Sequence, residues 1–128
     1  MSPVVGRHIF YNDSPFDGHD PAANLADDAA IATDKEALLP GQTATFANYT
    51  SYAAGINGLM IDVANLPSAS LTVADFSFAT GNSNTPGSWA AAPAPLSIMV
   101  RRGAGVNGSD RIELIWANGS VTNTWLQV

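Results

Sequence analysis

The N-terminal part of the chain carries six aspartates within 22 positions, although the sequence as a whole is poor in charged residues. Carboxylates this close together would repel one another, and a hard cation bound by oxygen ligands would relieve that repulsion. The spacing is not that of an EF-hand loop. The alternative is a solvated loop in which aspartates form turns and helix caps. We expect a structural calcium ion held by Asp17, Asp20, Asp28 and Asp34.

Aromatic side chains form a second group of candidates, because the apolar C–H faces of sugar rings stack on aromatic planes. The candidates are Trp89, Trp116, Trp125, Tyr49, Tyr52, Phe10, Tyr11 and Phe16. Trp125 shares one face of a predicted strand with Asn123 and Gln127, whose amides can hydrogen-bond sugar hydroxyls. Trp89 and Tyr52 lie in loop-like segments, where a buried ring is less expected. The competing interpretation is that the tryptophans belong to the core. The predicted carbohydrate-binding residues are Trp125, Trp89, Tyr52, Trp116, Gln127, Asn123, Glu113 and Arg111.

Residues for catalysis are few. The chain has two histidines, His8 in a predicted strand and His19 in the acidic loop, and it lacks the nucleophile-elbow, zinc-protease and Walker motifs. The glycine-rich segment 103–108 joins two predicted strands and does not open a helix, so it is no phosphate cradle. A pair of carboxylates that hydrolyses glycosides is an alternative that the sequence does not exclude. However, a chain this short offers little depth for an active-site cleft. We expect no catalytic residues.

Composition narrows the class of protein further. Eleven acidic residues against five basic ones give a net charge of −6, which disfavours nucleic acids and anionic membranes as partners. No apolar run approaches the length of a membrane span. The absence of cysteine excludes disulfides and thiolate chemistry.

The elements that must position these residues are strands: short β-branched and aromatic runs alternate with turn residues. This pattern predicts an all-β sandwich or jelly roll of two antiparallel sheets, with one long irregular N-terminal loop and at most one short helix within Pro21–Leu39. We expect residues 1–128 to form a single module cut from a longer secreted protein. The predicted strands are Val4–Tyr11, Ala44–Tyr49, Ile56–Ala64, Ser70–Ala79, Ser97–Arg102, Asp110–Ala117 and Thr122–Val128.

The last two predicted strands suggest a hairpin around Asn118-Gly119. A two-residue turn would bury Trp125, whereas a one-residue bulge would place Leu126 opposite Ile112 and Trp125 opposite Glu113. We favour the bulge, because it buries Leu126 and exposes only one large apolar residue among polar neighbours.

A resemblance to known proteins is carried by six segments of the chain, residues 6–12, 27–35, 38–41, 55–62, 105–111 and 125–128. Together they resemble β-sandwich modules near the C-termini of large secreted proteins of planctomycetes and soil bacteria. Some of these modules are appended to glycoside hydrolases, so the chain resembles a carbohydrate-binding module, with the β-glucan-binding family 81 as the nearest named group. The resemblance implies a β-sandwich, export, and attachment to a catalytic or adhesive neighbour.

Together these observations predict a secreted, non-catalytic module that holds a β-glucan, cellulose or related plant polysaccharide on an aromatic platform and is stabilised by calcium. The main alternative is a calcium-rigidified structural or adhesive spacer of a cell-surface protein that binds no sugar. A small glycoside-acting enzyme is the least favoured alternative.

Overall fold

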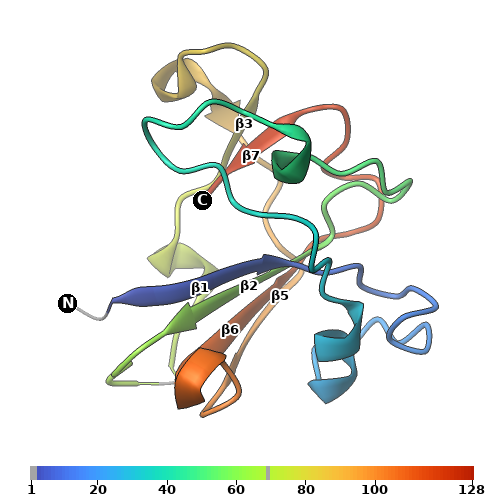
Figure 1. The fold of residues 1–128 in the computed structure, drawn as a ribbon, viewed down its shortest axis with the longest axis vertical. Coiled ribbons are helices and arrows are strands. Elements are labelled where there is room, and N and C mark those ends of the chain that lie inside the picture. The colour runs from blue at the N-terminus through green and yellow to red at the C-terminus, as the bar shows by residue number, and fades with distance from the viewer. Residues whose placement is uncertain (1–2, 69) are drawn as a thin grey trace.

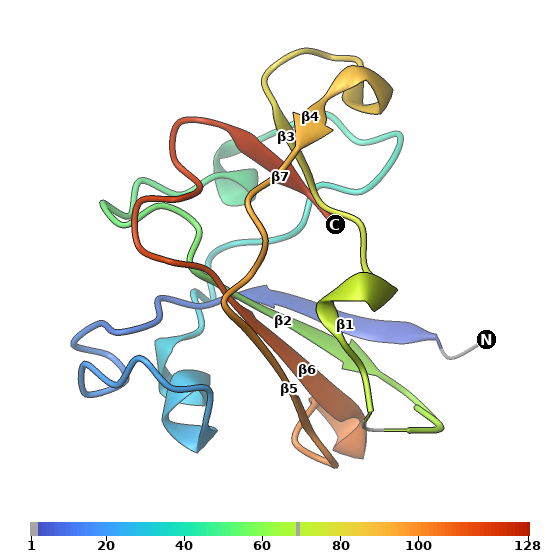
Figure 2. The same cartoon turned by 180° about the vertical axis from the view of Figure 1, so that it is seen from behind.

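The computed structural model describes residues 3–68 and 70–128 and has two antiparallel sheets, which confirms the predicted all-β sandwich class (Figures 1 and 2). The predicted module 1–128 also includes positions 1, 2 and 69, which lie outside the described residues. The first sheet, in the order β1-β2-β6-β5, contains β1 Val4–Ile9, β2 Gly58–Val63, β6 Asp110–Ile115 and β5 Ser97–Arg101. The second, in the order β4-β3-β7, contains β4 Ala90–Ala91, β3 Ala79–Gly81 and β7 Trp125–Gln127.

Within the described residues, five short 3₁₀ helices interrupt the connections between the strands. Two of them replace parts of predicted strands, Ala44–Tyr49 and Ser70–Ala79. In both, the fourth residue of a Thr-x-x-Asn or Thr-x-x-Asp segment caps the helix with its side chain. Asn48 accepts a hydrogen bond from the Thr45 amide at 2.8 Å, and Asp75 accepts one from the Thr72 amide at 2.8 Å. Such local bonds compete with strand pairing. The helices are η1 Leu25–Ala30, η2 Phe46–Asn48, η3 Val73–Asp75, η4 Pro86–Ser88 and η5 Val106–Gly108.

The predicted hairpin between the last two strands is wrong. β6 pairs with β2 and β5, whereas β7 pairs with β3, with Leu126 opposite Thr80. After β6 the chain leaves the first sheet, because Val121 is buried and its carbonyl accepts a hydrogen bond from the Ile56 amide at 2.9 Å. Leu126 still packs against the core, and strand alternation directs Trp125 to the opposite face of β7.

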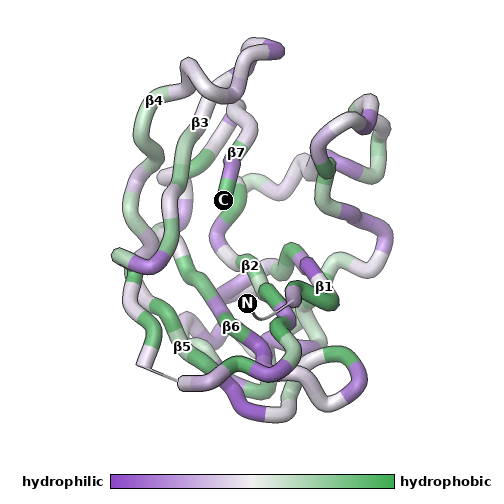
Figure 3. Tube along the Cα trace, turned by 90° about the vertical axis from the view of Figure 1, so that its left-hand side faces the viewer, coloured by the Kyte–Doolittle hydropathy of each residue, from purple (hydrophilic) through white to green (hydrophobic). Residues whose placement is uncertain are grey.

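The larger core lies on one face of the first sheet. Leu114, Trp116 and Val121 are its buried centre, and Phe78 and Leu126 pack against it from the second layer. Hydrophobic residues recur along β5 and β6 in Figure 3. Trp116 is only 1% exposed, and its indole N–H donates to the Pro93 carbonyl at 2.9 Å. The predicted role of Trp116 on an open sugar-binding face is therefore wrong.

The other face of the first sheet is covered by the N-terminal segment that includes η1. Phe10, Met60 and Ile115 form a small apolar cluster there with Ala30. Phe10 also forms an isolated antiparallel bridge with Ile31. This bridge ties the end of β1 to the end of η1, so that the segments following both elements start from the same point of the molecule.

Candidate functional site

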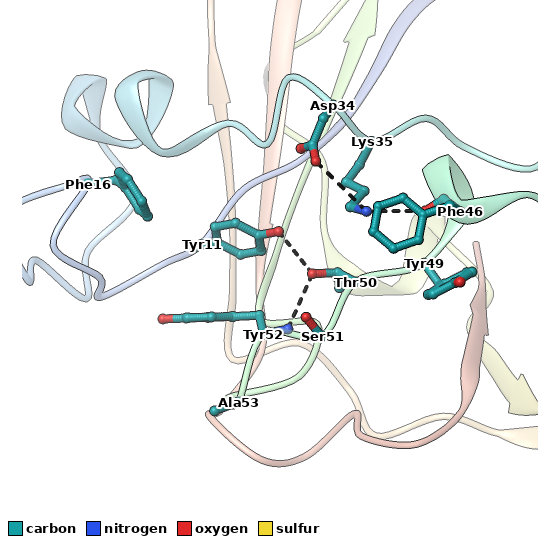
Figure 4. A pocket seen from close by; sticks show the side chains of 10 residues that line it. All are labelled: Tyr11, Phe16, Asp34, Lys35, Phe46, Tyr49, Thr50, Ser51, Tyr52 and Ala53. Atoms are coloured by element: carbon teal, nitrogen blue, oxygen red, sulfur yellow. Dashed lines mark hydrogen bonds and ion pairs between the residues drawn. The ribbon is translucent and has the colours of Figure 1, made fainter.

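A groove of about 410 Å³ opens between three loops, and all three tyrosines of the chain line it (Figure 4). Its volume falls within the roughly 300–1,000 Å³ that is typical of ligand sites. The loops follow β1, follow η1 and surround η2. The lining residues are Tyr11, Phe16, Asp34, Lys35, Phe46, Tyr49, Thr50, Ser51, Tyr52 and Ala53.

Tyr11, Phe16 and Tyr52 form the first aromatic wall. The Tyr11 and Tyr52 rings lie 4.5 Å apart between centroids, and the Tyr11 and Phe16 rings lie 6.4 Å apart. The Tyr11 amide donates to the Ala30 carbonyl at 3.1 Å, which fixes the tyrosine directly after the bridge at the end of β1. The wall therefore rests on the ordered edge of the first sheet.

Phe46 and Tyr49 form the second wall, at the beginning and just beyond the end of η2. Residues three apart eclipse each other in a 3₁₀ helix, and these two rings lie 5.3 Å apart in an edge-to-face arrangement. Lys35 contacts this wall: its ammonium group lies 3.9 Å from the Phe46 ring centroid and donates to the Phe46 carbonyl at 3.1 Å. The Lys35 side chain is only 9% exposed.

Polar groups lie between the two walls. The Tyr11 hydroxyl is 2.9 Å from the Thr50 hydroxyl, and the Tyr52 amide donates to the same Thr50 oxygen at 3.3 Å. Asp34 and Ser51 also line the groove, and in Figure 4 the side chains of Asp34 and Thr50 lie between the Tyr11 and Phe46 rings. Burial raises the pKa of Tyr52, and the nearby negative charges of Asp17 and Asp13 add to that effect.

The groove exposes an unusual amount of aromatic surface. Phe16 is 62% exposed, Phe46 69% and Tyr49 53%. Exposed apolar surface that is gathered in one place is typical of an interaction site. The combination of aromatic faces with hydroxyl, carboxylate and ammonium groups suits a ligand that is apolar on its faces and polar around its edges.

The predicted carbohydrate-binding residues lie in three parts of the molecule: the groove, the second sheet with the loops beside it, and the buried interior. Tyr52 lies in the groove. Trp125 and Gln127 lie on the outer face of β7, and Asn123 is exposed in the turn before it. Trp89 is half-buried over Gly81, the strand partner of Trp125, and its indole N–H donates to Ser83 at 3.1 Å.

Glu113 and Arg111 are 0% and 6% exposed, so the prediction that they line an open sugar-binding face is wrong. Strand alternation was correct, because both point to the same face of β6, but η1 covers that face. Arg111 donates to Asp62 from Nε at 2.8 Å and from Nη2 at 2.9 Å, and His8 lies 2.9 Å from the same carboxylate. Although burial raises the pKa of Asp62, the hydrogen bonds from Arg111 and His8 prevail and lower it to about 2.

Glu113 and Asp27 form a buried pair of carboxyl groups, and both residues are 0% exposed. Burial and then the hydrogen bond with Asp27 raise the pKa of Glu113 to about 8, in spite of Arg101, which donates to Glu113 at 2.6 Å. Burial also raises the pKa of Asp27. We infer that Glu113 carries a proton at neutral pH and donates it to Asp27.

The four predicted calcium ligands have separate surroundings. Asp17 accepts hydrogen bonds from the amides of residues 13 and 14, and Asp20 accepts one from the amide of residue 22. Asp28 pairs with both Arg101 and Arg111, and the side chain of Asp34 is 73% exposed. Among the described residues, no group of three or more His, Asp or Glu side chains has the arrangement of a metal site. The calcium ion stays a prediction.

Sequence reasoning missed Phe46 and Lys35, and it counted Tyr11, Phe16 and Tyr49 among the aromatic candidates without choosing them as binding residues. Two signals in the sequence could have identified the second wall. One is the Thr45-x-x-Asn48 cap, which favours a 3₁₀ helix over the predicted strand, and the other is the spacing of three positions between Phe46 and Tyr49. The first wall depends on a contact between segments about forty residues apart (Tyr11 with Tyr52), which local patterns do not contain.

Among the described residues, no helix has the length and apolar character needed to span a bilayer. Comparisons of the chain with family models, with curated proteins and with solved structures found no match. The geometry described above is therefore the basis for any functional conclusion.

Proposed function

We propose that this protein is a non-catalytic carbohydrate-binding module that holds a β-glucan or a related plant polysaccharide in the aromatic groove. The observation that carries the proposal is the pair of facing aromatic walls, each with an exposed ring, around a polar centre. Sugar rings would stack on Phe16 and Tyr52 on one side and on Phe46 and Tyr49 on the other. Thr50, Ser51 and Asp34 would hydrogen-bond the hydroxyl groups.

The choice of the groove over the second sheet rests on shape and chemistry. The outer face of β7 offers Trp125, with Trp89 near it, and both rings are half-buried. The groove offers five aromatic rings around a concave space, with hydroxyl groups between them. Concave, mostly apolar surfaces with a few polar groups are the usual form of ligand sites. Secretion and attachment to a glycoside hydrolase or an adhesive domain remain part of the same proposal.

The test uses one exposed ring from each wall and a control on the second sheet. We expect Phe16→Ala and Phe46→Ala each to weaken binding about tenfold, measured by affinity gel electrophoresis in soluble β-glucans. Because both side chains are more than half exposed, both variants should keep the melting temperature of the parent protein.

Trp125→Ala is the matched control and should leave retardation in the gel unchanged. Retardation that is lost in Trp125→Ala and kept in both phenylalanine variants would transfer the sugar site to the second sheet. The absence of binding across a polysaccharide panel by folded protein would instead favour the spacer.

A further inference from the structure

The groove presents negative charge to its ligand. Asp34 lines it, and the side chain of Asp34 is 73% exposed, so the carboxylate faces solvent. On the other wall, Asp13 and Asp17 lie close enough to Tyr52 to raise the pKa of its phenol, in addition to the effect of burial. The net charge of −6 has the same sign.

The positive charge of the groove, in contrast, is turned inward. Lys35 is the only lysine of the chain, and its side chain is 9% exposed. Its ammonium group donates to the Phe46 carbonyl and lies over the Phe46 ring. The Asp34 carboxylate is 3.9 Å away from it. Both residues line the groove, but the carboxylate of Asp34 is far more accessible to a ligand than the ammonium group of Lys35.

Aromatic faces attract cations, and exposed carboxylates near those faces add to the attraction. The ammonium group of Lys35 already makes such a contact with the Phe46 ring and lies 5.9 Å from the centroid of the Tyr49 ring. A second ammonium group on a ligand would find the exposed faces of Phe16, Tyr49 and Tyr52, with Asp34 within the same groove. The chemistry of the groove thus favours a positively charged ligand over a neutral one.

Resting on the proposed carbohydrate-binding function, we propose that the groove prefers amino sugars in their protonated form to neutral sugars of the same linkage. The ligand class is a β-1,4-linked oligosaccharide with free amino groups. A neutral glucan binds through stacking and hydroxyl contacts alone. The amino sugar adds cation–π contacts and attraction to Asp34.

The experiment compares three oligosaccharides of equal length that differ only at position 2 of each ring: glucose, N-acetylglucosamine and glucosamine, all β-1,4-linked. Isothermal titration calorimetry at low salt, at a pH where the amine is protonated, should give about tenfold tighter binding of the glucosamine oligomer. Raising the salt concentration should reduce this preference, because exposed charges are screened.

Two variants that each remove one negative charge test whether the preference for the glucosamine oligomer comes from the groove. Asp34→Asn should reduce the preference for the glucosamine oligomer to about threefold or less, because it should weaken binding of the glucosamine oligomer more than binding of the glucose oligomer. Asp75→Asn removes an exposed carboxylate on η3, outside the groove, and should leave the preference intact. An equal loss in both variants would mean general attraction by the acidic chain and would overturn the inference.

The inference and the proposed function can fail separately. Equal affinity for all three oligosaccharides, with binding still sensitive to Phe46→Ala, would overturn the amino-sugar preference and support the carbohydrate-binding function. No binding of any of the three, or of the β-glucan panel, by folded protein would overturn both.

Discussion

Replacing Glu113 by glutamine should make the protein more stable, and the gain should grow with pH. Glu113 is fully buried, and burial together with Asp27 raises its pKa from 4.5 to about 8. In the unfolded chain the same carboxyl ionises near 4.5. Between these two values the folded state holds a proton that the unfolded state has lost, so stability falls as pH rises. Glutamine keeps a neutral hydrogen-bonding side chain and removes this titration.

The size of the effect follows from the same values. The pKa difference of about 3.5 pH units, at 1.36 kcal/mol per unit, gives a ceiling of about 5 kcal/mol, reached above pH 8. Near pH 5 the wild-type protein and the Glu113→Gln variant should differ by less than about 1 kcal/mol. Near pH 8 we expect the variant to be more stable by about 2–4 kcal/mol, since relaxation around the buried pair reduces the ceiling.

Urea unfolding at intervals from pH 5 to pH 8 measures this difference directly. Glu36 is the only other glutamate of the chain and is exposed, so Glu36→Gln is the matched control and should follow the wild-type curve. Parallel stability curves for the wild-type protein and Glu113→Gln across this range would refute a shared proton between Glu113 and Asp27.

Two further predictions concern the fold and the metal. Gly55 has a φ of +74°, and a Cβ there would collide with the Val121 carbonyl, so Gly55→Ala should cost about 2 kcal/mol or more in urea unfolding. Gly41→Ala, at a φ of +85° with open space around it, should cost only about 1 kcal/mol; equal costs would contradict the collision. The predicted calcium ion should raise the melting temperature when calcium is added to EDTA-treated protein, because an ion that binds only the folded state adds stability. An unchanged melting temperature would count against that ion.

The sequence predicted the first sheet well, because its strands carry their own pattern. In β6, the alternation of Arg111, Glu113 and Ile115 with Ile112 and Leu114 correctly divided the side chains between two faces. The pattern did not reveal that the polar face is buried. That burial depends on Asp27 and Asp28, which lie more than eighty residues away and supply the partners of the buried charges.

The second sheet and the groove were harder to predict, because their strands are two or three residues long and their positions depend on long-range contacts. The pairing of β7 with β3 in place of β6 has no local signal. The aspartates illustrate a further ambiguity. The same residue type forms turns at Asp17 and Asp20 and an ion pair at Asp28, and the sequence pattern of a metal site is similar to that of several separate caps.

The buried charges and the groove are connected through one point of the chain. Asp28 pairs with Arg101 and Arg111 and so fixes η1 on the first sheet, and η1 ends at the bridge between Ile31 and Phe10. The groove residues Tyr11 and Asp34 follow that bridge by one and three positions. Replacing a buried ion pair by apolar residues often costs no stability, so such pairs are poor evidence for stabilisation. Here they explain how a loop-rich chain holds the first aromatic wall and the groove carboxylate in a fixed relation.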